Sequence, residues 1–146
     1  MSESPDRDDL RNRLALPLLF LRLTVGLFFL QWSVEKIVKP ETTAKIFDHF
    51  YGLDLSLSLA QALGVVEALV ALAILAGFKR RFTYGAAFVM HLGSTLSSWQ
   101  QLTDPYGSGN HLFAAAVPLL AAIWLLFRMA NYDDMLAFDA RGVKQA

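Results

Sequence analysis

Four long apolar runs constrain this chain more than any other feature of its sequence. They cover about residues 14–36, 57–78, 82–99 and 111–129. An α-helix needs about 20 apolar residues to cross the hydrocarbon core of a bilayer, which is about 30 Å thick. Inside lipid the backbone groups must pair within the protein, and a helix pairs them within one segment. We therefore expect an all-α integral membrane protein, a four-helix bundle that spans the bilayer with these four runs.

The connections between the runs predict one further element and two polar tails. Pro40 stands where a helix can begin, and Gly52 can supply its C-terminal cap. The apolar residues between them fall on one face, so we expect a short interfacial helix between the first and second spans. The predicted organisation is a cytosolic tail over residues 1–13, a transmembrane domain over 14–130 and a second cytosolic tail over 131–146.

Lysine and arginine are unequally divided between the two sides of the expected bundle. Nine lie on the side that holds both termini and three on the other. The nine are Arg7, Arg11, Arg13, Lys79, Arg80, Arg81, Arg128, Arg141 and Lys144, and the three are Lys36, Lys39 and Lys45. Cytoplasmic segments carry the excess of such residues, so both termini are expected in the cytoplasm.

Charge and cysteine content exclude several classes of function. The formal net charge is zero, so no nucleic acid partner is expected. The sequence holds no cysteine, which excludes thiol catalysis and thiolate metal sites within this chain.

Polar and small residues share one face on each of the first three spans. At about 100° per residue they form one stripe per helix. The stripes are Arg22, Gly26, Phe29, Ser33 and Lys36 on the first span, Gln61, Gly64, Glu67, Ala68 and Ala71 on the second, and Tyr84, His91, Thr95 and Ser98 on the third. Small residues allow close helix approach and polar residues find partners there, so each stripe is expected to face the bundle interior.

Arg22, Glu67 and His91 are the candidate site residues of this interior. At about 1.5 Å of rise per residue, counted from the basic ends of their spans, all three are expected near the bilayer midplane. Charged groups at that depth are rare and costly, so Arg22 and Glu67 are expected to form a pair. Two interpretations stay open. The pair is a structural clamp between the first two spans, or the three residues line a pocket for a ligand headgroup or a proton path.

A weaker candidate site lies at the outer rim, where Trp99, Asp104, Tyr106 and His111 gather. The alternative interpretation is an aromatic belt beside a solvated turn. A haem held by two histidines is not expected, because His91 and His111 differ in depth by roughly 10 Å or more. No histidine or carboxylate cluster has metal-ligand spacing. We therefore expect no metal and no covalently bound cofactor.

The order of several short motifs resembles that of the DoxX family of small four-helix membrane proteins. The motifs are Arg22-Leu23-x-x-Gly26-Leu27-x-Phe29-Leu30 followed by Lys36, then Gly64-x-x-Glu67-Ala68-Leu69, then Leu75-Ala76-Gly77 and a basic residue at 80 or 81. The resemblance runs roughly over residues 18–127. It departs at Ser33, where the family usually has glycine. The resemblance implies a four-helix bundle associated with membrane redox chemistry, as in subunits of thiosulfate:quinone oxidoreductases or partners of oxidative-stress enzymes.

Three hypotheses for function follow. By resemblance, the chain is an integral membrane subunit or accessory of a quinone-linked redox system in a bacterial inner membrane. Quinone would be its non-covalent ligand, membrane or periplasmic redox subunits would be its partners, and catalysis by the chain itself is left open. The second hypothesis is a carrier or pore for a small solute, with the same interior residues as its pathway. The third is a structural membrane scaffold whose stripes serve packing alone. In all three the lipid bilayer is the first partner.

Overall fold

The computed structural model describes residues 7–141, and these form helices and no strand. In chain order the helices are α1 (Arg7–Val38), α2 (Pro40–Tyr51), α3 (Leu57–Ala76), α4 (Arg80–Ser97), α5 (Trp99–Thr103), the 3₁₀ helix η1 (Asn110–Ala115), α6 (Ala116–Arg128) and α7 (Phe138–Arg141). Three stretches are long and apolar enough to cross a membrane, namely Asp8–Val38, Leu57–Ala76 and Asn110–Arg128. The expected all-helical fold is confirmed, with membrane-spanning character for three of the four predicted spans.

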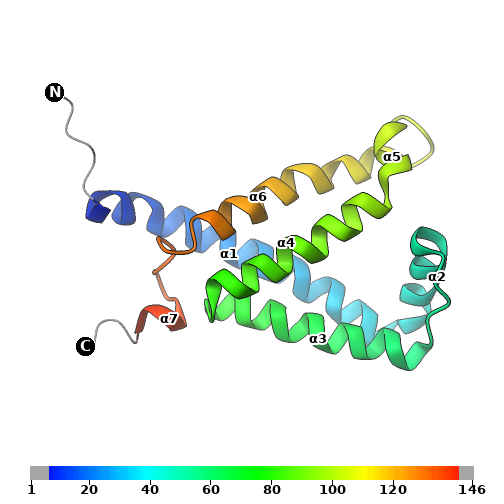
Figure 1. Cartoon of the computed structure of the whole chain (residues 1–146), viewed down its shortest axis with the longest axis horizontal. Coiled ribbons are helices and arrows are strands. Elements are labelled where there is room, and N and C mark those ends of the chain that lie inside the picture. The colour runs from blue at the N-terminus through cyan, green and yellow to red at the C-terminus, as the bar shows by residue number, and fades with distance from the viewer. Residues whose placement is uncertain (1–6, 142–146) are drawn as a thin grey trace.

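The long helices pack as two pairs. α1 lies along α3, and α4 lies along α6. The pairs meet near the tight turn between α3 and α4, and they diverge toward the end that holds α2 and α5 (Figure 1). The ring of Phe50 on α2 lies 5.9 Å from the ring of Phe113 on η1, measured between centroids. This contact bridges the two pairs at their open end.

α4 is not among the stretches that are apolar enough to cross a membrane by length and composition. It begins with Arg80 and Arg81, and it carries hydroxyl groups and His91 along one face. That face is turned inward, as the sequence predicted, since Tyr84, His91 and Thr95 are all buried. The mean hydropathy of α4 is therefore lowered by inward-facing polar residues, which would not contact lipid if the helix crossed a membrane.

A helix forms over Pro40–Tyr51, as predicted, with proline in its first turn. Gly52 adopts the left-handed conformation at φ 64° and closes the helix. Its N–H donates to the carbonyl of Asp48 at 3.0 Å, and the next N–H donates to Phe47. A left-handed cap costs glycine nothing because it has no Cβ. The interfacial position of this helix stays a prediction.

α1 and α3 approach each other closely through glycine, in agreement with the predicted stripes. A Cβ added to Gly64 would lie 2.8 Å from the Cβ of Lys36 and 2.9 Å from the carbonyl oxygen of Ser33. A Cβ on Gly26 would lie 2.6 Å from a side-chain carbon of Leu75. These contacts also fix the antiparallel register of the two helices.

Both segments predicted as cytosolic tails have structure within the described residues. The segment over 1–13 is helical from Arg7, and Asp8 and Asp9 in the first turn suit the positive end of the helix dipole. The segment expected as a tail over 131–146 folds back onto the bundle, where Asp133 and Ala137 are buried. Residues 1–6 and 142–146 lie outside the described part.

Candidate functional site

The predicted pair of Arg22 and Glu67 is wrong, because the register of α1 and α3 separates them. Gly26 faces Leu75, whereas Ser33 and Lys36 face Gly64. Arg22 therefore lies level with the turn after α3, and Glu67 lies level with Ser33. Eleven residues of helix separate these two levels, which is about 16 Å. The predicted depths were counted along each helix from its own basic end. Such a count does not include the offset between the two helices.

Arg22 instead binds the segment that follows α6. Its Nη1 donates to Oδ1 of Asp133 at 3.0 Å, and its Nη2 donates to the carbonyl of Met135 at 2.8 Å. The hydroxyl of Tyr84 donates to the other oxygen of Asp133. Arg22, Tyr84 and Asp133 are at most 1% exposed. This buried triad joins α1, α4 and the C-terminal segment, and it is a structural clamp.

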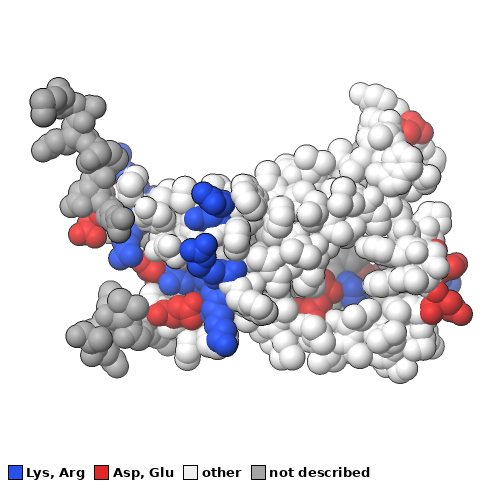
Figure 2. Space-filling model, in the orientation of Figure 1, with Lys and Arg blue, Asp and Glu red and all other residues white. Residues whose placement is uncertain are grey.

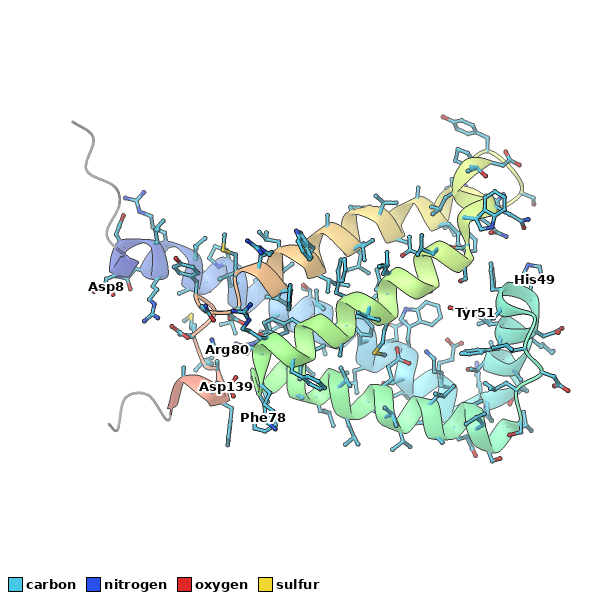
Figure 3. All side chains as sticks on the ribbon, viewed as in Figure 1. Asp8, His49, Tyr51, Phe78, Arg80 and Asp139 are labelled. Atoms are coloured by element: carbon cyan, nitrogen blue, oxygen red, sulfur yellow. The ribbon has the colours of Figure 1, made fainter. Side chains whose placement is uncertain are left out.

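Asp139 completes the attachment of the C-terminal segment by capping α4. Its carboxylate accepts the backbone N–H groups of Lys79 and Arg80, at 2.9 and 3.0 Å. Figure 3 labels Arg80 and Asp139 at this junction between α4 and α7. Partial burial acts to raise the pKa of Asp139, but the two N–H groups and the Arg80 charge outweigh it and hold that pKa below its usual value. The charged carboxylate therefore stabilises the positive end of α4.

Neither aspartate could be assigned a role from sequence, because both lie beyond the periodic helices in a segment without an apolar pattern. The only signal was the number of acidic residues after the fourth run, at Asp133, Asp134 and Asp139. Arg80 contacts all three of these residues, through the carbonyl of Asp133, the carboxylate of Asp134 at 2.8 Å and that of Asp139. This end of the bundle is thus held by internal ion pairs.

Glu67 pairs with Lys36 across the α1–α3 interface. The Nζ of Lys36 lies 2.7 Å from Oε2 of Glu67, and the two side chains are 20% and 11% exposed. Glu67 is in the middle of α3, a helix with no other charged residue. Ionisable groups at that depth in an apolar helix are costly and mark functional sites by default. Lys36 belonged to the predicted stripe of the first span, but it was not predicted as a site residue.

This ion pair is mostly buried but not fully closed off from the surroundings, as the side-chain exposures show. Figure 2 shows a mostly uncharged side face with a hollow between α3 and α4, and acidic and basic atoms are visible inside the hollow. The partial exposure of the Lys36 and Glu67 side chains agrees with a place on the wall of this hollow. Chemically, the pair consists of one ammonium donor and one carboxylate acceptor.

His91 faces the interior, as predicted, beside Phe28 and Phe29 of α1. Its Nε2 lies 3.1 Å from the carbonyl oxygen of Ala116. Its ring meets those of Phe28 and Phe29 edge to face, with centroids 5.8 and 6.4 Å apart. Within residues 7–141 no group of three histidine or carboxylate side chains could hold a metal ion. His91 therefore contributes an aromatic wall and one polar edge.

The predicted outer-rim residues are all exposed to the surroundings. Trp99 and Tyr106 are 58% and 97% exposed, and Asp104 and His111 are exposed as well. The side-chain amide of Asn110 donates to the carbonyl of Asp104, which closes the loop on itself. This arrangement fits the alternative interpretation of an aromatic belt and a solvated turn.

Comparison with known proteins gives one match. A family model described as DoxX matches residues 17–99, which include Arg22, Lys36, Glu67 and His91 but not Asp133. No curated protein and no protein of solved structure matches the chain. The matched part therefore contains the Lys36–Glu67 pair and ends before the segment that binds Arg22.

Proposed function

This chain belongs to the DoxX family of membrane proteins, and on that premise we propose that it is an integral membrane subunit or accessory of a quinone-linked redox system. The observation that carries the proposal is the Lys36–Glu67 ion pair, which is partly exposed on the side of an apolar bundle. In this proposal the pair and the wall at His91 receive the quinone headgroup.

The chemistry of the pair suits the two ends of a quinone ring. The ammonium of Lys36 can donate to a carbonyl oxygen, and the carboxylate of Glu67 can accept from the hydroxyl of the reduced form. The rings of Phe28, Phe29 and His91 pack together in the interior, and in this proposal the edge of that cluster forms the apolar wall of the site. Sites for such ligands combine apolar walls with a few placed polar groups.

Entry from the side favours a ligand that is dissolved in lipid. Many of the exposed side chains on the long helices are apolar, for example Leu69 at 63% and Val89 at 66%. Lipid rather than water would therefore surround the hollow, and a quinone would reach the pair without crossing an aqueous phase. Membrane or periplasmic redox subunits would complete the system.

The proposal includes four spans, with α4 as the third, in a bacterial inner membrane. Of the large hydrophobic residues of α4, Phe82, Val89 and Leu96 are exposed toward the surroundings. Of the twelve lysines and arginines other than Arg22, nine lie on the side of the termini. We expect both termini in the cytoplasm. Reporter fusions after Ala146 and within residues 100–110 should report opposite sides, and an exported C-terminus would contradict the topology.

Removing the ion pair tests the proposed ligand site. Lys36→Met combined with Glu67→Leu should fold, because well-packed apolar residues often replace a buried ion pair without loss of stability. The quinone retained per protein after purification, measured by extraction and chromatography, should fall about tenfold or more, since hydrogen bonds to charged groups contribute about 1.5–3 kcal/mol each. The matched control is Lys39→Met with Glu41→Leu, an equal change at exposed positions.

Other results of the quinone measurement would contradict the proposed ligand site. Equal quinone content in the site variant and the control would show that the pair is only a clamp. A parent protein that neither retains quinone nor takes it up from quinone-loaded nanodiscs would contradict the proposal. Solute flux in liposomes would then indicate a carrier, and its absence a scaffold.

A further inference from the structure

A small pocket lies beside the turn between α3 and α4, away from the Lys36–Glu67 pair. Its volume is about 320 Å³, and it is lined by Lys79, Arg80, Arg81, Phe82, Asn131 and Asp139, with Ala130. The pocket lies at the ends of two membrane-long segments, since the turn follows Leu57–Ala76 and the lining residues Ala130 and Asn131 follow Asn110–Arg128. The headgroup layer of a bilayer would lie at this level. The pocket therefore faces the zone in which lipid phosphates are found.

Two of the three basic residues in this pocket have no internal acidic partner. The Arg80 guanidinium is held by Asp134 and Asp139, and the Asp139 carboxylate is held by Arg80 and two backbone N–H groups. Among the ion pairs of residues 7–141, none involves Lys79 or Arg81. Both side chains are exposed. The pocket therefore presents two uncompensated positive charges to an anion.

An apolar stripe leads away from the pocket along α4. Phe82 lines the pocket and is 73% exposed, and Val89 and Leu96 follow on the same helix at 66% and 61%. Residues seven apart lie almost in one line on a helix, because seven steps of about 100° nearly complete two turns. The stripe is therefore a straight apolar track that begins at the two charges. An anionic group joined to an acyl chain matches both the two positive charges and the apolar stripe, whereas a free anion matches only the charges.

We propose that the pocket binds the phosphate headgroup of an anionic phospholipid from the surrounding bilayer, with an acyl chain along the Phe82–Val89–Leu96 stripe. Lys79 and Arg81 supply the charge that selects an anionic headgroup over a zwitterionic one. Asn131 supplies a side-chain amide donor. Basic pockets at the ends of membrane helices bind anionic headgroups by this combination of charge and hydrogen bonding. The site is independent of quinone binding and of the Lys36–Glu67 pair.

The test uses the full chain in detergent, with lipid added to raise its thermal unfolding midpoint. Dioleoyl phosphatidylglycerol should stabilise the parent at much lower concentration than dioleoyl phosphatidylcholine does. Lys79→Asn with Arg81→Gln should weaken the apparent affinity for phosphatidylglycerol roughly tenfold or more. Asparagine is chosen because Lys79 has a positive φ of 45°, which asparagine tolerates. Lys39→Gln with Lys45→Gln removes two exposed charges elsewhere and should keep the parent's affinity.

Three results would overturn the proposal. The first is an equal response of the parent to the two lipids, and the second is an equal loss of affinity in the pocket variant and the control. The third is stabilisation by glycerol phosphate at the same concentration as phosphatidylglycerol, which would indicate a site for a soluble anion. Counting lipids retained by the parent, by native mass spectrometry in a mixture of both lipids, tests the selectivity without any variant.

Discussion

Replacing Asp133 with alanine is expected to lower the free energy of unfolding by about 3–5 kcal/mol, as for other buried ion pairs that lose one partner. The change removes the acceptor of Arg22 and of the Tyr84 hydroxyl together. Arg22 is 1% exposed, so its positive charge would stay buried without its partner. Denaturant unfolding in detergent, followed by circular dichroism, measures the loss.

An exposed ion pair supplies the control for Asp133. Arg11 lies 3.7 Å from Asp134, with side chains 54% and 35% exposed, so Arg11→Ala should cost less than about 1 kcal/mol. The double variant Arg22→Met with Asp133→Leu should recover a large part of the loss, because it removes the unpaired charge. If the single-variant losses at Arg22 and Asp133 simply add, the two residues are not coupled and the clamp is misassigned.

Replacing Gly64 with leucine is expected to cost about 3 kcal/mol, at the upper end of the range for overpacking a well-filled interface. Even a Cβ would lie 2.8 Å from Lys36 and 2.9 Å from the backbone oxygen of Ser33, so α1 and α3 must move apart. The movement would also separate Lys36 from Glu67 across the same interface. Thermal unfolding in detergent measures the loss, and retained quinone reports on the pair.

Gly93 supplies a matched control for the same chemical change. It lies within α4, and an added Cβ would meet nothing within 4 Å. Gly93→Leu should therefore be neutral or slightly stabilising, since leucine favours a helix more than glycine does. Leu72→Ala should also be mild, because Leu72 is 51% exposed. Equal midpoints for the variants at 64 and 93 would mean that α1 and α3 do not touch at Gly64.

The ion pairs in the interior separate Arg22 from Glu67 and place them in different parts of the bundle. Arg22, predicted as part of the ligand site, belongs to a clamp that holds the C-terminal segment. Glu67, predicted as its partner, pairs with Lys36 across the α1–α3 interface. We therefore propose that the two interpretations left open for one pair, clamp and ligand site, apply to two different pairs. The Asp133 and Lys36–Glu67 variants test them separately.

The sequence alone determined where the long helices lie and which of their faces turn inward. Long apolar runs must satisfy their own backbone groups in lipid, so they form helices whatever their neighbours are. Polar and small residues at helical spacing have one favourable place, the helix interface, and Ser33, Gly64 and His91 all lie there. The first residue and the C-terminal cap of α2 could also be predicted from local sequence, because Pro40 and Gly52 act through their own backbone angles.

Only the tertiary structure decided which charged residue meets which. A depth counted along one helix assumes that all spans begin at the same level, but α1 begins at Arg7 and is offset against α3 by the contacts of Gly26 and Gly64. That offset depends on the shapes of two surfaces, and neither helix encodes it alone. Asp133 is buried because the chain turns back after α6, and a segment without periodicity does not predict such a return. The partners of Arg22 and Glu67 were therefore set by packing between elements.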